Sequence, residues 1–233
     1  IVEGTGRDVV VEVTRQGSDA DELRVETGDI GGVPTFRVIF PFDRINYSDE
    51  HGNYTISDLR VRDDGTFGHG AGGRRSSISS RSGAEAAADL VVRVPPGTTL
   101  DLKVGAGSVS ARGTRSDLSL DVIAATVSLN GTRGNVRVET ASGSVEAQDT
   151  DGNPDTDTGS GSVELSRVSA TSLRADTGSG SVRCQNVTAD DLKELLAFKT
   201  IRRIDFLTTK VSGPGLAVLA DLPLEHLFLP TNA

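Results

Sequence analysis

The sequence predicts a mainly β protein: a single-chain β-solenoid of about 18 residues per coil, followed by a small α/β segment that caps its C-terminal end. Three observations predict this fold class: a fixed repeat period, alternating apolar residues within each repeat, and glycines where each repeat must turn. Together they assign residues 1–189 to the solenoid and residues 190–233 to the cap.

The repeat is marked by a triplet made of a small residue, then Ser or Thr, then Val. A fixed period of this length is typical of solenoids, in which each coil buries its apolar face only by stacking on its neighbours. The regular coils are therefore predicted over residues 100–189. The valines of the triplets recur at this period, with the last interval longer by a single position, at Val109, Val127, Val145, Val163 and Val182.

Within each repeat, apolar and polar residues alternate, which predicts strands that turn every second side chain inward. Leu100, Leu102 and Val104 show the pattern, and Gly105–Gly107 then supplies the backbone freedom for a tight corner. Stacking places equivalent residues one strand spacing apart, roughly 4.8 Å. The predicted inward columns are Leu100, Leu118, Val136, Pro154 and Leu173; Ala111, Leu129, Ala147, Leu165 and Cys184; and Val104, Val122, Thr140, Thr158 and Thr177.

The N-terminal part, residues 1–99, is predicted to be an irregular β region that precedes the regular coils. Val9–Val13 alternates as a strand does. Residues 68–88 are rich in Gly, Ser and Arg, which predicts a mobile loop. Leu90–Val94 then predicts a strand, which the sequence Pro95–Gly97 ends with a turn.

Two motifs carry a resemblance to a known family. The stretch Val92–Thr98, with the sequence VRVPPGT, is followed by two copies of Thr-Gly-Ser-Gly-Ser-Val, at Thr158–Val163 and Thr177–Val182. These motifs resemble a bacterial adhesin family of domains of unknown function, and the resemblance covers roughly residues 1–189. It implies a β-solenoid at the cell envelope, and it brings no catalytic residues.

The pattern changes after Val187. Asp190–Phe198 is amphipathic and carries acids in its first turn, which predicts a helix. A spaced apolar pattern then recurs with a longer period, and it resembles a bacterial leucine-rich repeat over about residues 190–233. The resemblance implies a leucine-rich-repeat cap whose helix covers the last coil, and a chain that continues beyond Ala233 is the alternative. The recurring residues are Ile201, Ile204 and Phe206, then Leu224, Leu227 and Leu229.

Charge and composition restrict the partners and the compartment. The net charge is −9 and the pI about 4.8, so nucleic acid and anionic membrane surfaces would repel the chain. No apolar run approaches the ~18 residues of a membrane-spanning helix. The chain starts at Ile1 and has no Met, which favours a mature or trimmed product. A leader peptide that has been removed is compatible with this start. A single cysteine, Cys184, excludes an internal disulfide, and the Gly-, Ser- and Thr-rich composition favours an extracytoplasmic bacterial protein.

One turn between coils alternates oxygen-bearing side chains around a glycine, which suits a hard cation such as calcium. The spacing departs from the EF-hand loop, since Gly152 stands at position 4 where position 6 is required, and Ser160 stands at position 12. A solvated acidic turn is the alternative. Calcium is the one cofactor that the sequence suggests. The candidate metal ligands are Asp149, Asp151, Asn153, Asp155 and Asp157.

Acidic residues also form a predicted outward column, in which like charges one strand spacing apart repel each other. Arg137 and Arg174, two positions before members of the column, would compensate this charge. We interpret the column as a charge ladder on one coil face, with binding of a cation or a basic partner as the alternative. Its members are Asp121, Glu139, Asp157 and Asp176.

The sequence therefore predicts a non-enzymatic structural or adhesion module that is secreted or belongs to the cell envelope. A protein or a glycan at the cell surface is the expected partner, and the two open ends of the stack allow end-to-end self-association. The alternative function is a carbohydrate-active enzyme on a β-helix, which would use acids such as Glu139 and Asp157. Such enzymes also use aromatic residues in a groove, and no aromatic residue occurs between Phe67 and Phe198. No catalytic triad order, phosphate-binding loop or Cys/His metal spacing is present.

Overall fold

The computed structural model describes residues 1–47, 55–68, 72–79, 82–191, 203–207, 210–211 and 226–228. In these residues the secondary structure is mainly strand, with one short 3-10 helix, η1, at Ala20–Glu22. No helix in the described part of the chain is long and apolar enough to cross a membrane. The chain divides into two compact units: Ile1–Val10 together with Val92–Ala233, and Val11–Val91. The strands β2 (Val10–Gln16) and β9 (Ala87–Val94) each include the point where the chain passes between units.

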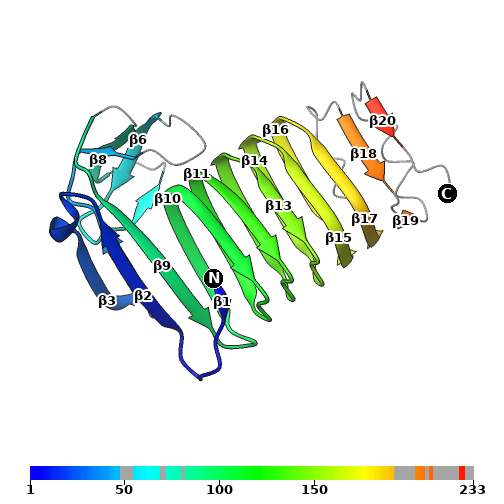
Figure 1. Ribbon diagram of the computed structural model, residues 1–233, viewed down its shortest axis with the longest axis horizontal. Coiled ribbons are helices and arrows are strands. Elements are labelled where there is room, and N and C mark those ends of the chain that lie inside the picture. Colours follow the sequence, from blue (N-terminus) through cyan, green and yellow to red (C-terminus); the bar gives the residue numbers. More distant parts are fainter. Residues whose placement is uncertain are drawn as a thin grey trace. The chain divides into compact units, whose positions relative to one another are not determined.

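The first unit is a β-solenoid, so the predicted fold class is confirmed (Figure 1). The strands named below pair in parallel, one coil beside the next in chain order. The strands are β1 (Val2–Glu3), β10 (Thr99–Arg112), β11 (Asp117–Asn130), β12 (Val136–Ser142), β13 (Val145–Gln148), β14 (Pro154–Ser160), β15 (Val163–Ser172), β16 (Arg174–Ser179) and β17 (Val182–Asp191).

The register between coils is the one that the repeat predicts. Val109 pairs with Val127, and the valines of the later triplets continue the same column. Between β14 and β16 the offset lengthens by a single position, because Asp155 pairs with Arg174. The predicted inward columns form the core, and Leu129 and Leu165 are fully buried in it. Full burial of such a side chain contributes about 1.5–3 kcal/mol, so the stacked columns are the main source of stability.

One corner of every coil has the same backbone conformation. At this corner φ is positive, which glycine adopts without strain and other residues rarely adopt. The first two coils place glycine there, whereas later coils hold Asp, Arg and Asn in the same conformation. Stacked coils must turn at the same point, so the neighbouring coils hold these residues in a conformation that Asp and Asn tolerate and Arg rarely adopts. The residues and their φ angles are Gly113 (61°), Gly131 (66°), Asp149 (54°), Arg167 (51°) and Asn186 (53°).

The short strand β1 lies between β9 and β10 and is parallel to both. Arg115 anchors it, because its Nε and Nη2 atoms each donate a hydrogen bond of 2.7 Å to the carboxylate of Glu3. The start of the chain therefore completes the sheet that the regular coils continue.

The second unit, Val11–Val91, contains two smaller sheets. An antiparallel hairpin joins β3 (Arg24–Ile30) to β4 (Val33–Ile39). The other sheet has the order β5-β8-β6-β7, formed by β5 (Arg44–Asn46), β6 (Thr55–Val61), β7 (Phe67–Gly68) and β8 (Arg74–Ser79).

The strand β8 falls inside residues 68–88, for which the sequence predicts a mobile loop, so that prediction was wrong for Arg74–Ser79. Ser76 and Ile78 are buried, and the Ser76 hydroxyl donates a hydrogen bond of 2.9 Å to the carbonyl of Phe42. Pairing with β5 and β6 satisfies the backbone of a segment whose composition favours a loop. The rest of the predicted loop includes residues 69–71 and 80–81, which lie outside the described residues.

Beyond β17, three short strands continue the parallel ladder: β18 (Arg203–Leu207), β19 (Lys210–Val211) and β20 (His226–Phe228). Ile204 pairs with Leu227, so the register offset here equals the period that the sequence predicts for this segment. The predicted helix at Asp190–Phe198 lies outside the described residues from 192 onward, and Asp190 and Asp191 end β17. The leucine-rich-repeat cap therefore stays a prediction.

Candidate functional site

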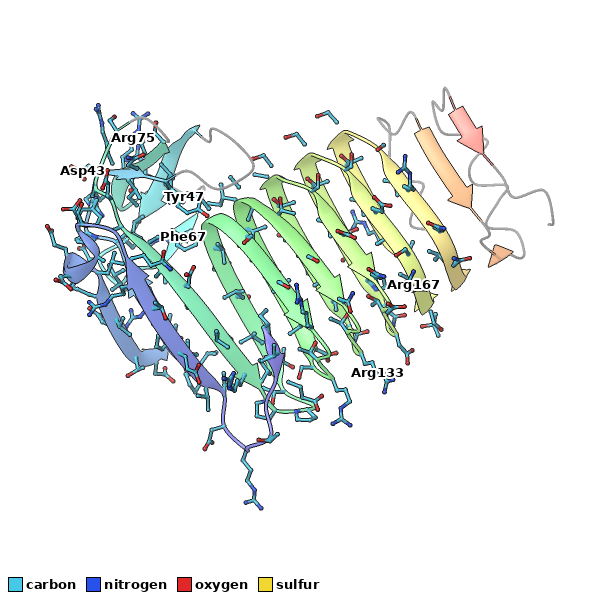
Figure 2. The ribbon with its side chains drawn as sticks, viewed as in Figure 1. Asp43, Tyr47, Phe67, Arg75, Arg133 and Arg167 are labelled. Atoms are coloured by element: carbon cyan, nitrogen blue, oxygen red, sulfur yellow. The ribbon has the colours of Figure 1, made fainter. Side chains whose placement is uncertain are left out.

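The predicted acidic column exists on one outer face of the solenoid. Its members are register partners on successive coils, and Lys103 extends the column at the β10 end. A second outward column runs beside it, two residues earlier on each strand, and consists of Asp101, Ser119, Arg137, Asp155 and Arg174. Figure 2 shows side chains projecting outward from the coils, among them the labelled Arg133 and Arg167.

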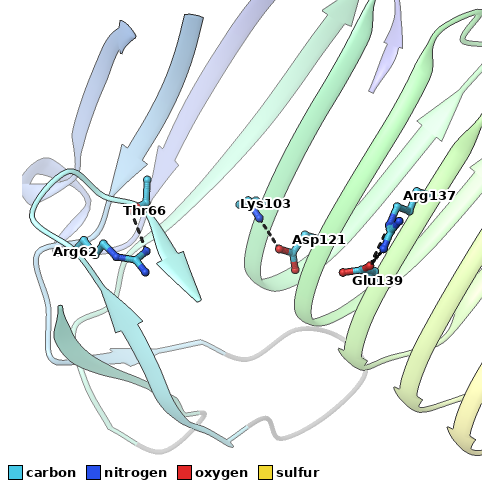
Figure 3. Close-up of polar contacts among 6 residues, drawn as sticks. All are labelled: Arg62, Thr66, Lys103, Asp121, Arg137 and Glu139. Atoms are coloured by element: carbon cyan, nitrogen blue, oxygen red, sulfur yellow. Dashed lines mark hydrogen bonds and ion pairs between the residues drawn. The ribbon is translucent and has the colours of Figure 1, made fainter. Parts of the chain in front are cut away.

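Basic side chains neutralise the first part of this face. Lys103 Nζ donates a hydrogen bond of 2.6 Å to Asp121 Oδ2, and Arg137 pairs with Glu139 (Figure 3). The hydrogen bond to Asp121 raises the pKa of Lys103, because it favours the charged ammonium. Both pairs are exposed, so they set the charge pattern of the face more than they stabilise the fold.

The other end of the column places two like charges on adjacent coils. Asp157 and Asp176 are register partners on adjacent coils. Partial burial, and after it the charge of Asp157, raise the pKa of Asp176, while Arg174 acts in the opposite direction. The face therefore changes from balanced pairs at β10–β12 to an excess of negative charge at β14–β16.

The five predicted calcium ligands have separate roles in the structure. Arg167 donates two hydrogen bonds to the Asp149 carboxylate, at 2.6 and 2.9 Å. The Oδ1 atom of Asn153 accepts bonds from the Thr171 hydroxyl and from the amides of Thr171 and Ser172.

The remaining three ligands are distributed along the stack. Asp151 is exposed and lies in a bridge between Arg133 and Ser169. Asp155 pairs with Arg174 at 3.8 Å, and Asp157 belongs to the acidic column. Within the described residues, no three His, Cys, Asp or Glu side chains are grouped so that they could hold a metal ion. The fold thus uses these oxygens mainly to join one coil to the next.

A hydrolytic site would need an acid pair and a reactive or proton-transferring partner. Glu139 and Asp157 are register partners, so their backbones are one strand spacing apart. The Glu139 carboxylate is already paired with Arg137. Cys184 is buried, which raises the pKa of its thiol to about 12, so it is not a nucleophile at neutral pH.

Sequence reasoning missed one feature, an arginine-lined pocket in the Val11–Val91 unit. Arg24, Arg62 and Arg74 line it, together with strand ends from both small sheets. These residues belong to no repeat and share no motif. The composition contained a weak signal, since residues 36–67 hold six of the nine aromatic residues and mark a region that is unlike the coils.

Comparisons with known proteins agree with this architecture. The family model described as Toastrack DUF4097 matches residues 7–196, which include all strands from β10 to β17. No curated protein and no solved structure is significantly similar to the chain. The adhesin and leucine-rich-repeat resemblances gain no support from these comparisons. Because the family model covers most of its length, the chain belongs to the Toastrack DUF4097 family, whose β-solenoid-like domain has no known function.

Proposed function

We propose that this chain is a non-enzymatic, extracytoplasmic module with a structural or adhesive role. The observation that carries the proposal is the uninterrupted parallel register from Thr99 to Asp191 around a core of stacked apolar columns. Such a stack is stiff, and it repeats the same outward positions on every coil. Repeated positions suit weak contacts that act together on an extended partner.

The charged coil face is the preferred binding surface of this module. Its excess acids at β14–β16 would attract a basic protein segment or an amino-bearing glycan, both of which occur at cell surfaces. A bead-adhesion assay tests this role. Beads that carry the chain should attach to cells or to purified envelope glycans more often than beads that carry albumin.

A matched pair of variants makes the assay specific. Asp157→Asn with Asp176→Asn should reduce attachment severalfold, whereas Glu146→Gln with Glu164→Gln, on another column, should change it little. Equal attachment by the chain and by albumin would contradict the adhesive role. The extracytoplasmic location is tested separately: protease added to intact cells that produce the protein should digest it.

A carbohydrate-active enzyme is the second candidate, and the register of Glu139 with Asp157 is the observation that favours it. Paired carboxylates about 5–10 Å apart act as acid and base in glycosidases. A panel of polysaccharides incubated with the chain should release no reducing ends if the first proposal is right. Release that is lost in Glu139→Ala and Asp157→Ala, and kept in Glu164→Ala, would establish the enzyme instead.

The finer assignments belong to the same proposal. The register offset between β18 and β20, which is longer than that between the regular coils, supports a leucine-rich-repeat cap on the last coil. End-to-end self-association would use whatever strand edges the full protein leaves open. Sedimentation equilibrium over a hundredfold concentration range tests it, since association would raise the weight-average mass with concentration.

A further inference from the structure

The Val11–Val91 unit contains a pocket of about 140 Å³ at the ends of four strands. Two register pairs frame it: Arg24 with Ile39 at the end of the β3–β4 hairpin, and Val61 with Arg74 at the end of the β6–β8 pair. The residues that line the pocket are Arg24, Ile39, Pro41, Val61, Arg62, Asp63 and Arg74.

We propose that this pocket binds a phosphate group. Three arginines and one aspartate are among its lining residues, within a chain whose net charge is −9. Arg24 and Arg74 form ion pairs with Glu26 and Asp43, which a bound anion would share. A phosphate ester carries a charge of about −1.5 to −2 at pH 7 and three strong acceptor oxygens, so it can accept hydrogen bonds from several of these guanidinium groups at once. Arginine also presents planar, forked donors that fit phosphate oxygens.

Arg74 is held in place before any ligand arrives. Its Nη1 donates a bond of 2.7 Å to Asp43 Oδ1, and its Nη2 donates one of 2.9 Å to the Phe40 carbonyl. These bonds connect β8 to the chain segment that follows β4. A fixed guanidinium loses little freedom on binding, which favours affinity.

Arg62 is positioned by a tight turn. Its amide donates to the Thr66 carbonyl at 2.8 Å, and its carbonyl accepts from the Gly65 amide at 2.9 Å. Its Nη1 donates a bond of 3.3 Å to the Thr66 hydroxyl (Figure 3). The same hydroxyl donates to Asp64 Oδ1. Arg37 holds the turn against β4 by donating to the Asp64 carbonyl. In the described residues the Arg62 guanidinium has no carboxylate partner at ion-pair distance, and its charge, after the hydrogen bonds from Thr66, helps to lower the pKa of Asp64. No salt bridge therefore has to break before Arg62 binds a ligand.

Arg24 and the apolar lining complete the pocket. Arg24 lies 3.5 Å from Glu26 in an exposed pair, with 58% of its side chain accessible, so it can turn toward an anion at little cost. Ile39, Pro41 and Val61 supply the apolar part of the lining, and Ile39 is buried. The proposal rests on the proposed role as a binding module, and it adds the chemical class of one ligand.

Isothermal titration of the whole chain with inorganic phosphate at low ionic strength tests the proposal, with sodium chloride of equal ionic strength as the reference. Saturable binding of one phosphate per chain is expected. A parallel titration with glycerol phosphate identifies the source: tighter binding of the ester indicates an esterified phosphate, and tighter binding of the free ion indicates inorganic phosphate.

Three variants make the test specific. Arg62→Gln should weaken binding about tenfold, and Asp63→Asn should strengthen it severalfold, since it removes the only acid in the lining. Arg44→Gln removes the same charge from the same unit outside the pocket and should change the Kd less than twofold. If Arg62→Gln lowers the melting temperature, Arg24→Gln takes its place.

Two results would overturn the proposal: no saturable phosphate binding, or equal losses in Arg62→Gln and Arg44→Gln, which would mean nonspecific charge attraction. Neither result would affect the bead-adhesion assay with the Asp157 and Asp176 variants, which tests a different unit. Failure of the phosphate site is therefore distinguishable from failure of the proposed adhesive role.

Discussion

Arg167 donates two hydrogen bonds to the carboxylate of Asp149, which occupies the equivalent position on the preceding coil. Both residues have positive φ, so the pair joins two corners in a backbone conformation that Asp tolerates and Arg rarely adopts. Asp149 is also the first of the predicted calcium ligands, and both of its carboxylate oxygens accept these bonds.

The hydrogen bond from Arg167, and then the charge of this guanidinium, lower the pKa of Asp149 below its ordinary value. A lowered folded-state pKa gives stability that is present above the unfolded-state pKa and lost as the pH falls through the folded-state pKa. Arg167→Gln should therefore raise the pKa of Asp149 in a carbon-13 NMR titration of its carboxyl group. Arg167→Lys, which keeps the charge, should raise it less. An unchanged pKa in Arg167→Gln would show that the two side chains do not pair in solution.

Calcium at 1 mM should leave the melting temperature of the chain unchanged, because Arg167 and neighbouring amides already satisfy Asp149 and Asn153. Differential scanning calorimetry with calcium and with EDTA checks this. A rise in melting temperature that Asp151→Ala abolishes would instead establish the calcium site at this turn.

Gly143→Ala should destabilise the fold far more than Gly131→Ala. A Cβ atom on Gly143 would lie 2.0 Å from the carbonyl oxygen of Ala125 on the preceding coil, whereas one on Gly131 meets nothing nearer than 3.7 Å. Gly131 has a φ of 66°, which other residues can adopt, whereas Gly143 has a φ of 143°, which strains any residue with a Cβ atom, so backbone strain adds to the clash at Gly143. We expect a cost of about 1 kcal/mol for Gly131→Ala and of about 3 kcal/mol or more for Gly143→Ala, measured by urea unfolding. Equal costs would mean that the coils are not stacked so closely.

Thr140 and Thr158 occupy the same buried column but differ in hydrogen bonding. Thr158 Oγ1 donates to the Gly143 carbonyl at 3.0 Å, whereas Thr140 Oγ1 finds no partner among the described residues. Thr140→Val should be neutral or stabilising, and Thr158→Val should cost about 1 kcal/mol in the free energy of unfolding. The reverse order in urea unfolding would show that the Thr140 hydroxyl is hydrogen-bonded in solution.

Burial in the core column raises the pKa of Cys184 to about 12. The thiol should react with Ellman's reagent at pH 8 only after the chain is unfolded by urea. Because the unfolded thiol ionises near pH 8.5 and the folded one does not, stability should fall as the pH rises above this value. Cys184→Ala should show a smaller fall, and rapid labelling of the folded chain would contradict the burial.

The solenoid itself could be predicted from the sequence because its information is local and repeated. The Val109 column, the inward threonines and the acidic ladder each follow from the same repeat offset, and the observed register confirms that offset. Every coil packs against coils of similar sequence, so the burial of one residue can be predicted from the residues at the same position in the neighbouring coils.

The non-repeating contacts could not be predicted in this way. The pairing of Glu3 with Arg115 joins residues 112 apart, and β8 forms from a segment whose composition favours a loop. The arginines of the pocket come together only because two unrelated strand pairs end at the same place.

The sequence by itself determined the period, the buried columns and the mainly β class of this protein. The tertiary structure decided which polar side chains are already paired, and so which remain available to a ligand. Apolar burial follows from the direction of each side chain within a strand, whereas hydrogen bonds and ion pairs depend on partner atoms that only the folded chain brings within reach.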